Sequence, residues 1–139
     1  MKKIKQKYTN ASVDIYLDSS FSQLSKLVDK KNTVIITDEN IFSVHRAVFK
    51  NWNVITLKPG EAFKIQLTAD AIIEQLIGFQ ADRATTLVGV GGGVVTDLTG
   101  YVASIYMRGI QFGFVPTSLL AMVDASIGGK NGVDVGAYK

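Results

Sequence analysis

The 139-residue sequence contains no cysteine and a single histidine. Without cysteine the chain cannot form disulfides, thiolate metal sites or a thiol nucleophile. The one histidine, His45, falls in a predicted helix with no companion ligand, so we interpret it as a surface residue and assign no metal ligands in this chain. No apolar run approaches the roughly 18 to 20 residues needed to cross a bilayer. We therefore expect a soluble protein with no membrane partner.

Charged residues are also scarce, at 19% of the chain, and the net charge is only +3. Part of the positive excess lies in the N-terminal MKKIKQKYTN, and no basic-aromatic cluster accompanies it. The following ASVDIYLDSS is too polar to be the apolar core of an export signal. We therefore expect a cytoplasmic protein that binds an anionic small ligand and no nucleic acid.

Apolar residues are plentiful by comparison, since hydrophobic types make up 47% of the sequence. That content suffices to offset chain entropy, and a chain of this length builds one compact core. No internal repeat, low-complexity segment or linker divides the sequence. We predict a single α/β domain covering residues 1–139.

Short β-branched runs alternate with stretches of helical period along the chain, which predicts a Rossmann-like, largely parallel sheet with helices on both faces. Strands buried on both sides have apolar residues at consecutive positions, as in 33–37 and 85–90. In the helices, apolar stripes place Leu24, Leu27, Val28, Ile72, Ile73, Leu76 and Ile77 in the predicted core. The predicted strands are 12–17, 33–37, 53–57, 85–90 and 111–115, and the predicted helices are 21–29, 41–49, 69–79 and 93–106.

The strongest local feature is LVGVGGGVVTDLTGYVAS, in which a strand enters three glycines and then a helix. Unpaired amides and the positive end of the helix dipole meet at Gly91, Gly92 and Gly93, and the missing β-carbons let a phosphate approach. We predict a pyrophosphate site there. Asp97 is expected in the first helical turn, where a carboxylate is favoured with or without a ligand. Tight turns also require glycine, so the triplet alone is a moderate signal.

An ordinary dinucleotide fingerprint has its acidic residue after the glycines, whereas Asp38 precedes them here. Ligands of open α/β sheets nevertheless lie beyond the carboxyl ends of the strands. Asp38 with Asn40, and the segment Pro59–Lys64 with Glu61 and Lys64, all follow predicted strands and should reach the rim that holds Gly91. For Asp38 and Asn40 an alternative role is to cap a helix.

The C-terminal part of the sequence gathers Arg108, Asp124, Lys130 and Lys139 among small residues. Cations suit a phosphate-bearing substrate, and a carboxylate can orient a hydroxyl or accept a proton. The glycine-rich stretch after Pro116 favours a loop shaped around a ligand or a second domain. A frayed tail is the alternative, because chain ends are often poorly ordered.

Three colinear segments between about Val34 and Lys139 resemble the 3-dehydroquinate synthase family: PGEAFK, GGGVVTDLTGYVASIYMRG and FVPTSLLAMVDASIGGKNGVD. The resemblance implies NAD as cofactor and a phosphate-eliminating lyase of the shikimate pathway, which converts 3-deoxy-D-arabino-heptulosonate 7-phosphate to 3-dehydroquinate. The residues that the resemblance assigns to the cofactor site are Asp38, Asn40, Glu61, Lys64, Gly91, Gly92, Gly93, Val94, Asp97, Thr117, Ser118, Lys130 and Lys139.

The same resemblance implies that Arg108 lies near the substrate phosphate, Asp124 near its hydroxyls and Lys130 at the substrate site. Two mild departures are Thr96, where many members have glycine, and Ser118, where a second threonine is usual. The resemblance also implies that the full-length enzyme is a homodimer and has a helical second domain that holds zinc or cobalt. We expect that domain to be absent from this chain, and the chain alone to give no turnover.

Three alternatives remain open from the sequence. A related sugar-phosphate cyclase, such as 2-deoxy-scyllo-inosose synthase, shares the fold and cofactor. Glycerol and iron-type alcohol dehydrogenases also have a glycine triplet, but Val94 and the run Asp97-Leu98-Thr99-Gly100 argue against them. The third is a binding module that holds NAD without turnover.

Overall fold

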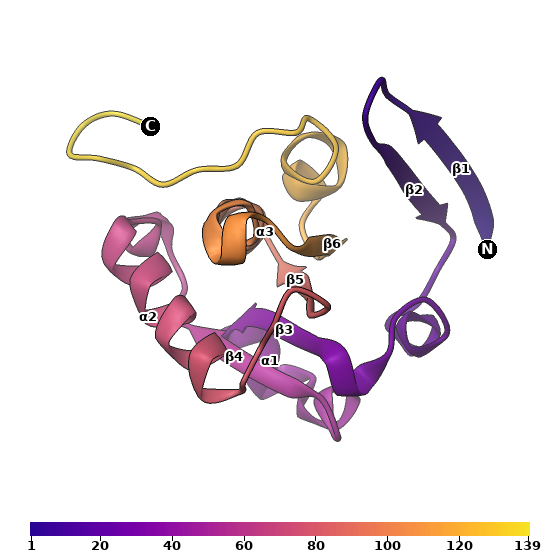
Figure 1. The fold of residues 1–139 in the computed structure, drawn as a ribbon, viewed down its shortest axis with the longest axis horizontal. Helices are drawn as coiled ribbons and strands as arrows, with labels where there is room; N and C mark the ends of the chain where they lie inside the picture. Colours follow the sequence, from indigo (N-terminus) through magenta and orange to yellow (C-terminus); the bar gives the residue numbers. More distant parts are fainter.

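The computed structural model describes residues 1–139 and has a central sheet of four parallel strands. The strands lie in the order β4-β3-β5-β6, and they pair in parallel register throughout. Helices cover both faces of this sheet (Figure 1), so the predicted α/β class is confirmed. Their bounds are β3 (Thr33–Asp38), β4 (Asn53–Leu57), β5 (Thr86–Gly91) and β6 (Gln111–Pro116).

Alternate residues of each strand enter one of two apolar cores, one on each face of the sheet. Val34 and Ile36 of β3 pack beneath the helices α2 (Gln66–Gly78) and α3 (Gly93–Ile105). Ile35 points the other way, where the covering elements are shorter: α1 (Glu39–Val44) and the 3-10 segments η1 (Phe21–Lys26) and η3 (Arg46–Phe49). Burial on both sides explains why the strands read as unbroken apolar runs.

The first two strands form a separate antiparallel ribbon, which stands apart from the main sheet in Figure 1. β2 (Ser12–Leu17) was predicted as a strand of the parallel sheet, and that assignment is wrong. Its partner, β1 (Lys2–Lys7), was not predicted, because its lysines obscure the alternation. The register places Ile4, Val13, Ile15 and Leu17 on one face and Lys3, Lys5 and Lys7 on the other, where Lys3 Nζ lies 2.9 Å from Asp14 Oδ2.

Several helical predictions need correction at their ends or in their type. Instead of an α-helix over 21–29, only Phe21–Lys26 are helical, as the 3-10 segment η1, and Leu27 at its end is exposed rather than in the core. On α2 the stripe formed by Ile72 and Leu76 is buried, whereas Ile77 is 62% exposed. His45 is exposed, as predicted. The remaining short segments are η2 (Lys30–Asn32), η4 (Glu61–Phe63), η5 (Tyr106–Arg108) and the π-helical η6 (Ala121–Ala125). No helix has the length and apolarity that a bilayer-spanning helix requires.

The strand order creates a topological switch point between β3 and β5. From β3 the chain crosses to β4 on one side, and from β5 it crosses to β6 on the other. The two connections run over opposite faces of the sheet, because crossovers between parallel strands are right-handed. The loops that leave β3 and β5 therefore diverge, and ligands of open α/β sheets bind in the crevice between such loops.

Leu98 of α3 has no exposed surface, so Leu98→Ala should lower the free energy of unfolding by about 2–5 kcal/mol. Leu67 on α2 is 74% exposed, and Leu67→Ala should change the same quantity by less than about 0.5 kcal/mol. Urea denaturation of both variants measures the difference. Equal effects would contradict the assignment of α3 to the core.

Candidate functional site

Three loops meet at the carboxyl ends of β3, β4 and β5 and enclose a hollow of about 180 Å³. Asp38 lines it from the end of β3, residues 58–60 from the end of β4, and residues 92–95 from the β5–α3 bend. The sequence predicted that these loops would converge, and the structure confirms it. The hollow lies at the switch point between β3 and β5.

The bend from β5 into α3 presents the start of a 13-residue helix to this hollow. Gly92 is the N-cap in an extended conformation, and the first amides of α3 have no carbonyl partner within the helix. The buried Thr96 hydroxyl donates to the carbonyls of Gly92 (3.3 Å) and Gly93 (3.1 Å), so it ties the first turn to the bend. Free amides and the helix dipole together favour an anion at this position.

The three glycines of the bend serve different purposes. A β-carbon on Gly91 would lie 2.6 Å from Val95 Cγ2, so this glycine allows α3 to pack against β5. A β-carbon on Gly92 would lie 3.5 Å from Ser118 Oγ, and one on Gly93 would lie 3.8 Å from Ala125 Cβ. Both of the latter are ordinary contacts. Packing explains Gly91, whereas the protein's own atoms do not require glycine at 92 or 93.

Asp38 lines the hollow and also caps α1, because its Oδ1 accepts a hydrogen bond from the Ile41 amide at 2.9 Å. The capping alternative for Asp38 is therefore correct, and the Oδ2 atom is left for another donor. Asn40 is exposed, and its carbonyl accepts a bond from Ser43. It does not line the hollow.

Lys64 lies at the centre of a charged cluster beside the bend. Its Nζ is 3.0 Å from Glu61 Oε1, 3.2 Å from Asp97 Oδ2 and 3.8 Å from Asp134 Oδ1. Lys139 Nζ lies 3.6 Å from Glu61 Oε1. The prediction that Asp97 lies in the first turn of α3 is wrong. The helix begins at Gly93, so Asp97 falls in the second turn and faces Lys64.

Burial and the hydrogen bonds within this cluster shift the pKa values of its side chains. Burial raises the pKa of the Asp97 carboxyl above its usual value, and the bond with Lys64 offsets only part of that rise. The same ammonium lowers the pKa of Glu61. For Lys64 burial favours the neutral amine, but the bonds to Glu61 and Asp97 outweigh it and raise the pKa. Lys64 is therefore firmly charged.

The loop after β6 borders the same bend. The Thr117 amide donates to the Gly91 carbonyl at 2.9 Å. Ser118 Oγ accepts a bond from the Ala121 amide, so it caps the helical segment that includes η6. Asp124 lies in η6 with an exposed side chain, and its charge contributes to the rise in the pKa of Asp97. Thr117 and Ser118 therefore lie beside the glycines, while the predicted roles of these residues and of Asp124 toward a ligand stay predictions.

Arg108 and Lys130 are not brought into the cluster within this chain. Arg108 follows the C-terminal end of α3, about 20 Å along the helix from the glycine bend, at the opposite edge of the sheet. Its backbone is left-handed, with φ of 67°. Lys130 is exposed in the segment after η6. Their predicted roles toward a substrate therefore stay predictions.

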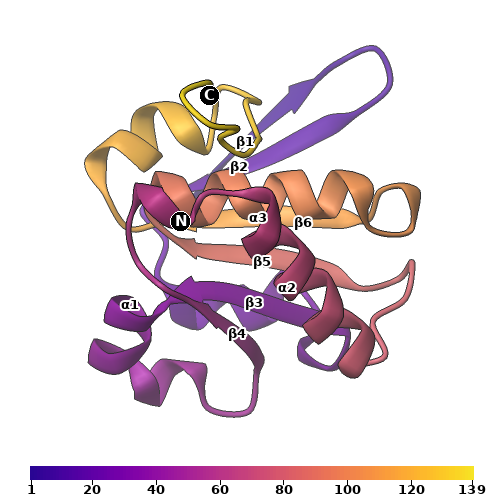
Figure 2. The same cartoon turned by 90° about the vertical axis from the view of Figure 1, so that its left-hand side faces the viewer.

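The C-terminal segment folds back over α3, as Figures 1 and 2 show, rather than fraying. Asn131 packs so closely on Gly100 that a β-carbon there would clash, and Val133 packs on the core. The Asp134 amide donates to the Lys64 carbonyl at 2.7 Å.

Asp134 was missed from the sequence, because nothing near it indicates that the chain returns to the loop after β4. Lys58 was missed too, although its position after a strand was a usable signal.

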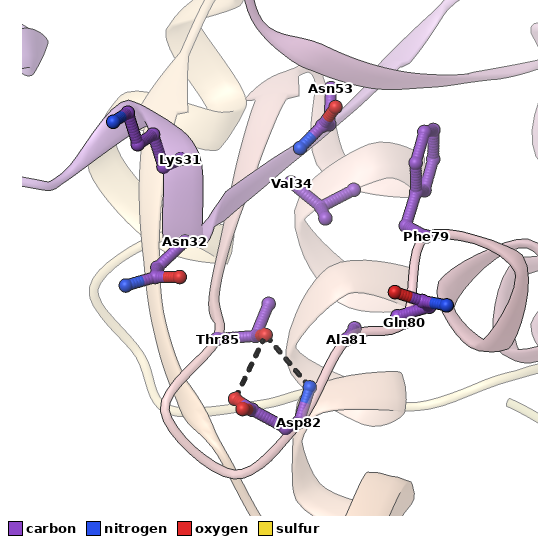
Figure 3. Close-up of a pocket in the computed structure, with 9 residues that line it drawn as sticks. All are labelled: Lys31, Asn32, Val34, Asn53, Phe79, Gln80, Ala81, Asp82 and Thr85. Atoms are coloured by element: carbon purple, nitrogen blue, oxygen red, sulfur yellow. Dashed lines mark hydrogen bonds between the residues drawn. The ribbon is translucent and has the colours of Figure 1, made fainter.

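A second hollow of about 170 Å³ lies at the opposite edge of the sheet, beside the starts of β3, β4 and β5. Two of its residues, Asp82 and Thr85, bond to each other within one turn (Figure 3): the Asp82 amide donates to Thr85 Oγ1 at 2.9 Å, and Thr85 Oγ1 donates to Asp82 Oδ1 at 3.5 Å. No helix long enough to present free amides to an anion begins beside this hollow. The candidate site is therefore the hollow at the glycine bend. No group of three or more His, Asp or Glu residues is placed to hold a metal ion.

The fold and the bend together define an α/β domain with a hollow and a helix N-terminus at its switch point. A family model described as 3-dehydroquinate synthase N-terminal matches residues 54–139. The chain is 39% identical over 141 residues to 3-dehydroquinate synthase from Clostridium kluyveri, a match that covers 95% of this chain and 39% of that protein. It is 42% identical over 119 residues to that of Campylobacter curvus, covering 81% and 34%. The chain belongs to the 3-dehydroquinate synthase family and spans 34–39% of the length of these two relatives.

Solved structures share the fold. A crystal structure of 2-deoxy-scyllo-inosose synthase matches with a TM-score of 0.83 at 22% identity, over 99% of this chain and 42% of that chain. The 2-epi-5-epi-valiolone synthase of Streptomyces hygroscopicus, with NAD+ and Zn2+ bound, matches with a TM-score of 0.70 at 28% identity, over 78% and 33%. The fold is that of the sugar-phosphate cyclases.

Gly91→Ala should destabilise the protein by about 1–3 kcal/mol, because the new methyl group overlaps Val95. Gly92→Ala should leave stability nearly unchanged, since its β-carbon would make only an ordinary contact, 3.5 Å from Ser118 Oγ. The double variant Gly91→Ala/Val95→Ala should recover part of the loss. Denaturant unfolding of the three variants measures this, and equal stability of Gly91→Ala and Gly92→Ala would contradict the packing role of Gly91.

The raised pKa of Asp97 gives a pH dependence of opposite sign to that of Glu61. Folded Asp97 keeps its proton to higher pH than the unfolded chain, so the free energy of unfolding falls as pH rises above 3.8. The lowered pKa of Glu61 makes stability rise with pH only below 4.5. In Asp97→Asn the decline above about pH 4.5, where Glu61 no longer contributes, should disappear. Urea unfolding across that range tests this, and a decline retained in Asp97→Asn would refute it.

Proposed function

We propose that this chain binds NAD at the rim between β3 and β5, with the paired phosphates against the first amides of α3. We propose further that it serves a 3-dehydroquinate synthase, which converts 3-deoxy-D-arabino-heptulosonate 7-phosphate to 3-dehydroquinate and phosphate. One observation carries the cofactor site: packing requires glycine at Gly91, where a β-carbon would overlap Val95, but not at Gly92 and Gly93, where a β-carbon would make only ordinary contacts with Ser118 and Ala125. Membership of the family supports the reaction.

The surrounding side chains suit a dinucleotide. Asp38 Oδ2 has the free acceptor that a ribose hydroxyl needs, since Oδ1 is used in capping α1. Gly92, Gly93 and Val94 line the hollow where the phosphates would meet the helix. Thr117 and Ser118 border the bend from β6. The remaining proposed contacts of the cofactor are Asn40, Glu61, Lys64, Asp97, Lys130 and Lys139.

NAD supplies a hydride acceptor that is restored within the turnover, and the chain's own contribution is orientation and charge. The charged Lys64 and the carboxylate of Asp97 lie on one side of the bend and fix polar groups of a ligand there. Asp124 and Lys130 are both exposed, and we propose that Asp124 accepts a hydrogen bond from a substrate hydroxyl and that Lys130 offers a cation to the substrate phosphate. The position of Arg108, about 20 Å along α3 from the bend, does not support a role for it at the same phosphate within this chain. The residues of this chain offer no set that would hold a divalent metal.

Another sugar-phosphate cyclase is the second candidate, because the neighbour with a TM-score of 0.83 is a 2-deoxy-scyllo-inosose synthase. At 22% identity that likeness bears on the fold only. Steady-state assays with the heptulosonate phosphate and with glucose 6-phosphate separate the two reactions. A probable glycerol dehydrogenase shares the fold less closely, with a TM-score of 0.55. The prediction that residues 1–139 alone bind NAD without turnover is tested in the same assays.

We also propose that the whole protein acts as a homodimer in the cytoplasm and uses zinc or cobalt. The NAD+- and Zn2+-bound state of the valiolone synthase neighbour supports the cofactor pair. Sedimentation velocity measures the dimer, and metal analysis of the purified protein measures the metal.

Gly92→Val should weaken NAD binding by at least tenfold, because the side chain enters the space proposed for the phosphates. Gly78→Val is the matched control. Its β-carbon would likewise meet no clash, since nothing lies within 4 Å of it, and Gly78 lies at the end of α2, away from the bend. Isothermal titration calorimetry with NAD compares both variants with the parent protein. An affinity of Gly92→Val equal to that of the control would refute this placement of the cofactor.

A further inference from the structure

One carboxylate oxygen of the charged cluster is buried without a hydrogen-bond donor: Oδ1 of Asp134. Its position is fixed by the main chain, because the Asp134 amide donates to the Lys64 carbonyl and Asp134 bridges to Ile65 in parallel register. The side chain is therefore held beside Lys64 whether or not the charges attract. An unsatisfied buried carboxylate oxygen costs free energy unless a cation or donor reaches it.

The Lys64 ammonium has three N–H donors, and three carboxylates surround it. Glu61 and Asp97 lie at hydrogen-bond distance, at 3.0 and 3.2 Å. Asp134 Oδ1 lies at 3.8 Å, which is within ion-pair range but longer than a hydrogen bond. A movement of less than about 1 Å would complete a third bond.

The cluster also holds more negative than positive charge. Glu61, Asp97 and Asp134 face only the two ammonium groups of Lys64 and Lys139. Asp97 is the partner that adjoins the bend, since it projects from the second turn of α3. A ligand hydroxyl that donates to Asp97 would take that carboxylate from Lys64. Lys64 then needs another partner to stay charged in a largely buried position.

We infer that Asp134 is a positioning residue for Lys64. When Asp97 turns to hydroxyl groups of a bound dinucleotide, Asp134 accepts a hydrogen bond from the third N–H of the Lys64 ammonium. Asp134 suits this better than Glu61 does, because the Glu61 side chain is half exposed and its attraction is screened by water. The Asp134 oxygen is buried, where the same charge acts more strongly. The inference rests on the proposed NAD site.

The test compares Asp134→Asn, which keeps the shape and removes the charge, with Asp70→Asn as matched control. Asp70 is an exposed carboxylate on α2 that accepts a bond from Gln66 Nε2. Nitrogen-15 NMR measures the pKa of the Lys64 ammonium in the ligand-free protein, and calorimetry measures the NAD dissociation constant. Asp134→Asn should lower the pKa of Lys64 and weaken NAD binding by about tenfold, which is about 1.4 kcal/mol. Asp70→Asn should change neither quantity.

A double-mutant cycle separates positioning from a general structural effect. In the Lys64→Met background, Asp134→Asn should have no further effect on the dissociation constant, because the residue acts through Lys64. Equal effects in both backgrounds, or an unchanged pKa of Lys64, would overturn the inference. If the parent protein bound no NAD, the proposed function would fail, and the pKa of Lys64 would still decide the role of Asp134. Asp134→Ser is the second uncharged variant if Asp134→Asn does not fold.

Discussion

The close contact between Gly91 of β5 and Val95 of α3 sets the geometry on which the rest of the site depends. Because no β-carbon separates them, the helix starts directly against the end of the strand. If α3 started a few ångströms further from the end of β5, its free amides would no longer face the crevice between β3 and β5. The Thr37 hydroxyl, which donates to the Val90 carbonyl at 2.7 Å, joins the two strands just below this point. The position of the free amides at residues 92 and 93 thus depends on the packing of the preceding residue, Gly91, against Val95.

The two central strands of the sheet, β3 and β5, were predictable from the sequence because they carry consecutive buried residues, as in 33–37. That pattern has a single physical cause, burial on both faces. The N-terminal ribbon was not predictable. Its β1 strand is exposed along its whole length, so no burial pattern marks it. The segment 21–29 has a helical period, yet only residues 21–26 are helical, as a 3-10 turn with Leu24 buried and Phe21 partly buried against the second core.

The candidate site was predictable as far as one rule reaches, namely that loops after parallel strands share an edge. Asp38, Glu61 and the glycines followed from it. Asp97 was placed one turn too early although the predicted helix start, residue 93, matches the structure, because Asp97 is the fifth residue of α3 and so lies just beyond its first turn. Arg108 was grouped with the site through its charge and its family motif, although α3 carries it to the opposite edge. Asp134 depends on a tertiary return of the chain, which local patterns do not encode.

The exposed ribbon has a consequence for how the protein behaves in concentrated solution. An unpaired strand edge is a template for joining other chains, and β1 carries Lys2, Lys3, Lys5 and Lys7 along that edge. Like charges keep two such edges apart while the Debye length, about 10 Å at 0.1 M ionic strength, exceeds their spacing. Added salt shortens that length to about 3 Å at 1 M and removes the protection. Dilute buffers, rather than high salt, therefore keep the ribbon from self-association.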